Sequence, residues 1–167
     1  KEFKASGNVL DIDVSADGTR LVTALEGGFV EVWNLVKADG LNEKGVGMHL
    51  LYFTAADFGA RDATKGGLQA ALWGQFVLDN AATVEEALTL LDGIQPLMVD
   101  HEGIKATVHL AIEDATGDSA IIEYIPGGKK TVYHNRDYRI MTNDPSYDQQ
   151  LANRDVWLAT LDRKRQL

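Results

Sequence analysis

The chain has 167 residues, 45% of them hydrophobic, which suffices for one compact domain with an apolar core. Its 16 basic and 25 acidic residues give a formal net charge of −9, which repels nucleic acid and anionic membrane surfaces. The absence of cysteine excludes disulfide bonds and thiolate metal sites. No apolar run approaches the roughly 20 residues of a membrane span. We therefore expect a soluble protein, cytoplasmic or periplasmic, without nucleic-acid or membrane partners.

Three short apolar runs predict antiparallel strands near the start of the chain. Val9–Val14, Thr19–Leu25 and Phe29–Leu35 alternate apolar and polar side chains, and glycine-containing turns separate them. The stretch 7–35 resembles a single WD repeat of a β-propeller. Because one blade cannot close a propeller, we expect 1–37 to be a divergent WD-like β-meander. Amphipathic hairpins with ordinary turn residues remain the alternative.

The middle of the chain predicts a strand followed by a pair of helices. Turns at 38–40 and 42–45 precede an apolar strand over Val46–Phe53. Apolar side chains at helical spacing predict a helix over Leu68–Leu78. A second helix begins at Thr83, with Glu86 as its capping-box partner, and ends at Gly93.

The last third predicts two hairpins and a helix. Thr107–Glu113 and Ala120–Ile125 form one hairpin, Thr131–His134 extends it, Tyr138–Thr142 is a last strand, and a helix runs from Ser146 onward. This order indicates an α+β fold with antiparallel sheets, a helix pair and a C-terminal helix. The three tryptophans lie on separate elements and are expected to pack in the core: Trp33, Trp73 and Trp157.

Metal and cofactor motifs are absent from the sequence. His101, His109 and His134 lack the HExxH spacing of a zinc site. Residues 13–18 imitate the start of an EF-hand loop, but Ala24 stands where the bidentate glutamate belongs. We therefore predict no metal and no cofactor.

Several segments occur in the order of one known family. The first is ADGLNEKG at 38–45 and the last is YRIMTNDPSYDQQ at 138–150; between them lie WGQFVLDN at 73–80, ATVEEA at 82–87 and HLAI at 109–112. Together with DATGDSA, which follows HLAI, they resemble the choloylglycine hydrolase and penicillin V acylase family over 38–153. The resemblance implies an N-terminal-nucleophile hydrolase fold, a four-layer αββα sandwich, present here only in part. We expect 1–167 to form a single domain.

The resemblance also implies an activity and a set of site residues. The family cleaves linear amides with an N-terminal cysteine whose own α-amino group is the base, but this chain starts with Lys1 and has no cysteine. By position, the side chain of Asn143 and the backbone N–H of Tyr52 match the donors that stabilise the oxyanion. Ser6 is a nucleophile candidate only if cleavage after Ala5 exposes it. Arg139 is a candidate contact for a substrate carboxylate, with ordinary ion pairing as the alternative.

Two functional hypotheses follow. The first is an incomplete linear amide hydrolase of this family that takes a small-molecule amide and is inactive alone, because the nucleophile is missing. The second is a non-catalytic interaction module that offers the WD-like strands of 1–37 as an edge for pairing. Self-association is compatible with both.

Overall fold

The computed structural model describes residues 9–14, 20–26, 29–34, 39–98, 100–101, 104–105, 107–137 and 140–165. The chain packs as two compact units, Lys1–Lys37 and Ala38–Leu167. The division falls where the WD-like segment was expected to give way to the family-like segment. The single domain over 1–167 stays a prediction.

The first unit is a three-stranded antiparallel meander. Its strands pair in the order β1-β2-β3. They run over Val9–Val14 (β1), Arg20–Leu25 (β2) and Phe29–Asn34 (β3). The three predicted strands are confirmed, whereas the likeness to a WD repeat stays a prediction.

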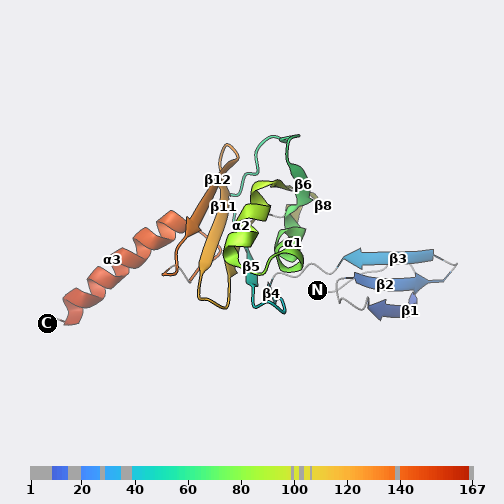
Figure 1. The fold of residues 1–167 in the computed structure, drawn as a ribbon, viewed down its shortest axis with the longest axis horizontal. Helices are drawn as coiled ribbons and strands as arrows, with labels where there is room; N and C mark the ends of the chain where they lie inside the picture. Colours follow the sequence, from blue (N-terminus) through green and yellow to red (C-terminus); the bar gives the residue numbers. More distant parts are fainter. Residues whose placement is uncertain are drawn as a thin grey trace. The chain divides into compact units, whose positions relative to one another are not determined.

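The second unit is built on a five-stranded antiparallel sheet with the order β12-β11-β10-β5-β4 (Figure 1). The strands run over Asp39–Leu41 (β4), Gly47–Tyr52 (β5), Val108–Glu113 (β10), Ser119–Ile125 (β11) and Lys129–His134 (β12). In the central register, Leu110 lies opposite both Leu50 and Ile122. The predicted strand at 46–53 and the two consecutive hairpins are confirmed.

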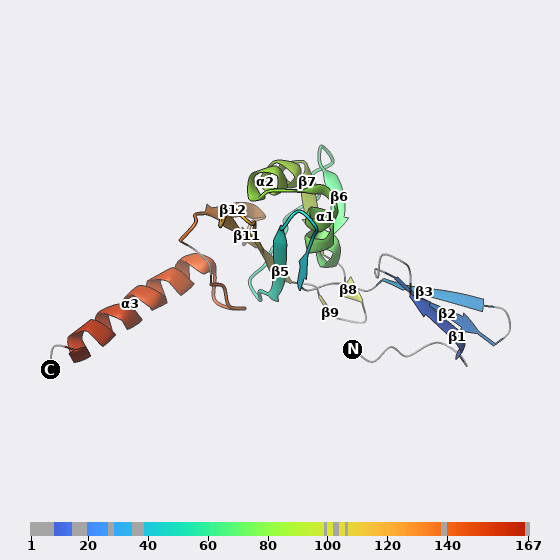
Figure 2. The same cartoon turned by 60° about the horizontal axis from the view of Figure 1, so that its bottom comes forward.

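Two short helices cover one face of this sheet, α1 (Trp73–Asn80) and α2 (Val84–Asp92), as Figures 1 and 2 show. Side chains alternate between the faces of a strand, so one face of each central strand packs against the helices and the other does not. The core between helices and sheet includes these side chains, each at most 1% exposed: Met48, Trp73, Val77, Leu91, Leu110, Ile112 and Ile122.

Side-chain caps fix the helices to the loops beside them. The Asn42 amide donates to the carbonyl oxygens of Leu78 and Ala81, at 2.9 and 2.8 Å, which supplies partners at the C-terminal end of α1. At α2, the Glu86 N–H donates to the Thr83 hydroxyl, and the Glu86 carboxylate accepts from the N–H of residue 82. Glu86 therefore acts as the predicted capping partner, and α2 ends before Gly93 as expected.

The first helix starts later than its apolar spacing predicts. Residues Gly66–Gln69 form a strand, β6, which pairs in parallel with β7 (Ile94–Leu97). A 3₁₀ turn, η1 (Ala70–Leu72), then leads into α1. Both helices lie between β6 and β7 in the chain. The spacing of apolar residues within 68–78 therefore could not indicate that β6 pairs with β7. The predicted turn at 38–40 is likewise wrong in part, since Asp39–Leu41 pairs with β5 as β4.

The C-terminal helix is confirmed as α3 (Tyr147–Arg165). The strand predicted at Tyr138–Thr142 is not: 140–142 form no strand, and 138–139 lie outside the described residues. A short two-stranded pair, β8 (Asp100–His101) and β9 (Ile104–Lys105), completes the unit. Within the described ranges, none of the helices combines the length and the apolar character that a membrane span requires.

Candidate functional site

A side-chain bridge joins the ends of two distant segments. The Asp144 carboxylate accepts from the backbone N–H of Thr54 at 3.1 Å and from its hydroxyl at 2.8 Å, across 90 residues of sequence. Asn143 directly precedes Asp144, and Tyr52 lies two residues before Thr54. Because consecutive Cα atoms are about 3.8 Å apart, the bridge keeps the two predicted oxyanion donors in neighbouring segments.

The strand pairing sets the direction of the Tyr52 N–H. The N–H of the next residue, Phe53, donates to the carbonyl of Thr107, next to β10, at 2.9 Å. Successive N–H groups of a strand point to opposite edges, so the Tyr52 N–H points to the β4 side of β5. On that side the described pairing ends at Asp39 and His49, three residues before Tyr52. The Tyr52 N–H therefore lies at a part of the edge that β4 does not cover.

The other predicted site residues are placed less fully. Asn143 is exposed in the loop before α3, and the Tyr52 side chain is also exposed, at 52%. Ser6 and Arg139 lie outside the described residues. Their predicted roles stay predictions.

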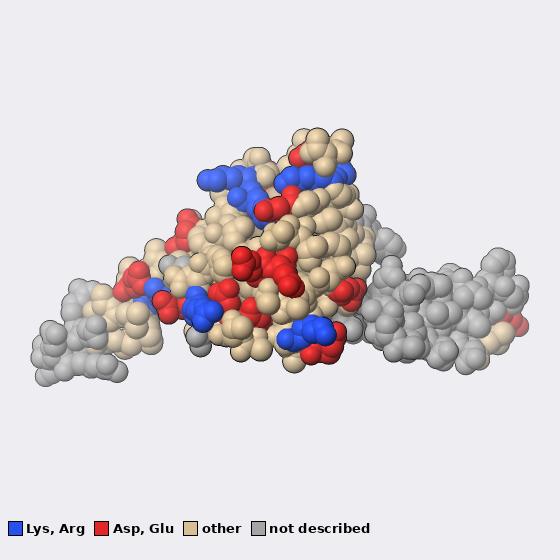
Figure 3. Space-filling view, in the orientation of Figure 1, with Lys and Arg blue, Asp and Glu red and all other residues tan. Residues whose placement is uncertain are grey.

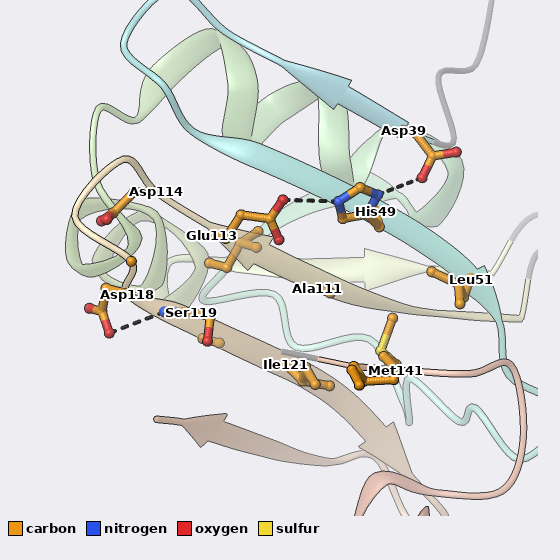
Figure 4. A pocket seen from close by; sticks show the side chains of 14 residues that line it. Asp39, His49, Leu51, Ala111, Glu113, Asp114, Asp118, Ser119, Ile121 and Met141 are labelled. Carbon is orange, nitrogen blue, oxygen red and sulfur yellow. Dashed lines mark hydrogen bonds and ion pairs between the residues drawn. The ribbon is translucent and has the colours of Figure 1, made fainter. Parts of the chain in front are cut away.

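A cavity of about 700 Å³ lies on the sheet face opposite the helices (Figure 4). Its apolar lining includes Leu51, Ala111, Ile121 and Met141. Leu51 is the neighbour of Tyr52 in the chain, and Met141 lies two residues before Asn143. Neither predicted donor lines the cavity. Two residues of its apolar lining, Leu51 and Met141, are close to the donors in the chain.

At the polar end of the cavity, the His49 side chain lies between two carboxylates (Figure 4). His49 Nδ1 lies 2.7 Å from Asp39, and Nε2 lies 3.0 Å from Glu113. A histidine donates from both ring nitrogens only when it is protonated. Partial burial by itself lowers the pKa of His49, but the hydrogen bonds to Asp39 and Glu113 outweigh it and raise that pKa above 6.5.

This raised pKa predicts a pH-dependent contribution to stability. The contribution is complete below the unfolded value of 6.5 and is lost as the pH rises through the higher folded value. We expect His49→Gln to remove this component, so that urea unfolding between about pH 5.5 and 8.5 shows a smaller decline for the variant than for the wild type. The difference is small, because the His49 side chain is 41% exposed. Equal pH profiles for the two proteins would contradict the assignment.

The other described histidine side chains also face carboxylates and not one another. His109 is fully buried against Glu123, and His134 lies 2.8 Å from Asp118. Among the described residues there is no group of three or more side chains placed to hold a metal ion. On the face shown in Figure 3, acidic side chains gather in the region of α1 and α2, where Asp79 is exposed.

The sequence did not indicate the bridge between Thr54 and Asp144. Asp144 stands inside the TNDP segment that carried the resemblance, but nothing in the sequence indicates that its carboxylate reaches Thr54. Only the fold brings the two together.

Comparisons with known proteins agree on one family. The family model "Linear amide C-N hydrolases, choloylglycine hydrolase family" matches residues 20–166. The chain is 44% identical over 125 residues to penicillin V acylase of Pectobacterium atrosepticum, across 71% of this chain and 33% of that protein. It is 30% identical over 120 residues to a bile salt hydrolase/transferase of Clostridium perfringens, across 70% of this chain and 36% of that protein.

Solved structures show the same fold. Penicillin V acylase from Agrobacterium tumefaciens is similar with a TM-score of 0.65 and 35% identity, over 92% of this chain and 47% of that one. A variant of conjugated bile acid hydrolase from Clostridium perfringens is similar with a TM-score of 0.66 and 26% identity, over 87% and 46%. These likenesses confirm the predicted partial α+β fold. The chain spans about a third of the length of the curated relatives it matches.

Proposed function

We propose, because the chain belongs to the choloylglycine hydrolase family of linear amide C–N hydrolases, that it forms the oxyanion side of an amide-hydrolysing site. The Asn143 side-chain amide and the Tyr52 backbone N–H donate to the substrate carbonyl oxygen. The observation that carries this proposal is the bridge between Asp144 and Thr54, which holds together the two segments that contain the donors.

The chemistry explains why such donors matter. When a nucleophile attacks an amide carbon, negative charge develops on the carbonyl oxygen, and fixed hydrogen-bond donors stabilise it more strongly than they stabilise the ground state. Removing one such donor costs roughly 3–4 kcal/mol of transition-state stabilisation. The Tyr52 N–H is fixed by the β5 backbone, and the loop of Asn143 is held by Asp144.

The cavity on the open sheet face suggests the kind of acyl group. Its apolar end, with Leu51 and Met141, suits an apolar acyl group whose amide reaches the two donors. The names of the relatives include penicillin V acylase and bile salt hydrolase, so the proposed substrates are linear amides of these two kinds. The higher identity to a penicillin V acylase, 44% against 30% for the bile salt hydrolase/transferase, favours penicillin V as the first substrate to test.

The missing thiol determines what this chain does alone. It has no cysteine, so we expect it to bind the amide without hydrolysing it. Hydrolysis of penicillin V that is abolished by Ser6→Ala would instead identify Ser6 as a replacement nucleophile. The alternative of a non-catalytic interaction module is not favoured, because the family match includes β2 and β3 and continues to residue 166.

A titration of the isotope-labelled chain with penicillin V tests the proposal. We expect shifts in the NMR signals of the Tyr52 backbone amide and the Asn143 side-chain amide. Asn143→Ala should weaken binding about three- to tenfold, the worth of one neutral hydrogen bond. Asn153→Ala, on an exposed turn of α3, is the matched control and should bind as the wild type does. Unchanged affinity in Asn143→Ala would refute the role of Asn143.

A further inference from the structure

A histidine and a glutamate form a buried pair on the sheet face opposite the helices. His109 on β10 and Glu123 on β11 are each 0% exposed, and His109 Nδ1 lies 2.9 Å from Glu123 Oε1. They stand one residue beyond the paired residues Leu110 and Ile122, so they are direct cross-strand neighbours. Within the described residues, His109 Nε2 has no hydrogen-bond partner.

Each member of the pair holds one of the two segments of the proposed site. The Phe53 ring stacks on the His109 ring, with centroids 4.9 Å apart and an interplanar angle of 12°. The Tyr147 N–H, at the start of α3, donates to both carboxylate oxygens of Glu123, at 3.0 and 3.1 Å. A carboxylate at a helix N-terminus is favoured by the helix dipole as well as by the hydrogen bonds. The Tyr147 ring is also anchored, 5.1 Å edge-on from the Tyr133 ring.

These contacts form one continuous connection between the two segments that carry the donors. Phe53 follows Tyr52 directly, and Tyr147 lies four residues after Asn143. From Phe53 the connection passes through His109 and Glu123 to Tyr147. The bridge between Thr54 and Asp144 closes it on the other side.

We propose that His109 and Glu123 are positioning residues that set the Tyr52 and Asn143 donors in register with each other. The proposal rests on the proposed function for the identity of the donors. An apolar pair would fill the same space without the desolvation of two ionisable groups, and buried ion pairs often add little to stability over such a pair. The specific gain here is directional: one carboxylate orients both the imidazole under Phe53 and the first N–H of α3.

Hydrogen exchange in Glu123→Gln and His109→Gln tests the connection. Both substitutions retain a polar side chain that can hydrogen-bond, so both variants are expected to fold. The amides of Tyr147 and Thr54 report the two segments, because one donates to Glu123 and the other to Asp144. We expect Glu123→Gln to accelerate exchange at both amides at least tenfold, and His109→Gln to accelerate Tyr147 as well, although residue 109 has no direct bond to it. Exchange within β10 and β11 should keep its wild-type rate.

A purely local role gives a different pattern. If Glu123→Gln accelerates Tyr147 alone and leaves Thr54 unchanged, the pair only caps α3 and the proposal fails. It also fails if His109→Gln leaves Tyr147 unchanged. Glu85→Leu, at an exposed position of α2, is the control and should change neither amide.

Penicillin V affinity separates this inference from the proposed function. If the wild type binds penicillin V, we expect both variants to bind it about three- to tenfold more weakly, as Asn143→Ala does, because a displaced donor loses its hydrogen bond. Unchanged affinity would overturn the positioning role while leaving the proposed function intact. If the wild type shows no binding, the proposed function fails, and the exchange rates at Tyr147 and Thr54 alone decide whether the pair holds the two segments together.

Discussion

Replacement of Trp73 by alanine is expected to lower the free energy of unfolding by about 3–5 kcal/mol, the usual cost of deleting a large buried aromatic side chain. Trp73 begins α1 and is 1% exposed. Its ring packs edge-on against Tyr124 on β11, with centroids 5.8 Å apart, so it joins the helix layer to the sheet. Urea denaturation followed by circular dichroism measures the change without relying on the lost fluorophore.

Trp157 offers the matched control, because it is the same residue type on another helix. Its side chain is 61% exposed on α3, and we expect Trp157→Ala to change stability by less than about 0.5 kcal/mol. Equal losses in the two variants would show that α3 packs its Trp157 face against other parts of the chain. A small loss in Trp73→Ala would show instead that the layer between α1 and β11 is loosely packed.

The two tryptophans also show what the sequence can reveal about burial. Both were predicted to pack in the core, and only Trp73 does so in the described structure. Spacing shows which side chains share a helix face, but not what covers that face. Along α3, Val156 and Leu158 are exposed beside Trp157.

Elements defined by neighbouring residues were predicted well. The hairpin of β10 and β11 depends on a local turn, and the start of α2 depends on the Thr83 hydroxyl and Glu86, three residues apart. The pairing of β6 with β7 joins residues on either side of both helices. Local spacing therefore predicted, wrongly, that a helix begins at Leu68.

The candidate site was predictable only as far as the resemblance reached. Asn143 and Tyr52 came from matched motifs, and no spacing rule relates residues this far apart in the chain. The pairing of His109 with Glu123 depends on the register of β10 and β11, and the bridge from Asp144 to Thr54 depends on where the loop before α3 lies relative to the end of β5. Neither contact had a sequence signal. For His109, the spacing of the histidines excluded a zinc motif and indicated no role near the site.

The second large effect concerns two glycines whose backbones touch. Gly59 and Gly128 have φ angles of +70° and +72°, and a Cβ added to Gly128 would lie 2.7 Å from the Gly59 Cα. Backbone atoms cannot move aside as a flexible side chain can. Asp57 tightens the contact by accepting from the N–H groups of Gly59 and Gly127, at 2.9 and 2.8 Å. This approach joins the loop after β5 to the turn between β11 and β12.

We therefore expect Gly128→Ala to lower the free energy of unfolding by about 2–4 kcal/mol, the sum of left-handed backbone strain and a steric clash. The neighbouring Gly127 separates these two causes. Its φ is +88°, but a Cβ there would meet nothing within 4 Å, so Gly127→Ala should cost only the strain, about 1–2 kcal/mol. Urea denaturation of both variants measures the difference. Equal costs would mean that the loop yields at Gly59, so that the two turns are not locked together and the contact adds nothing beyond the left-handed geometry of each glycine.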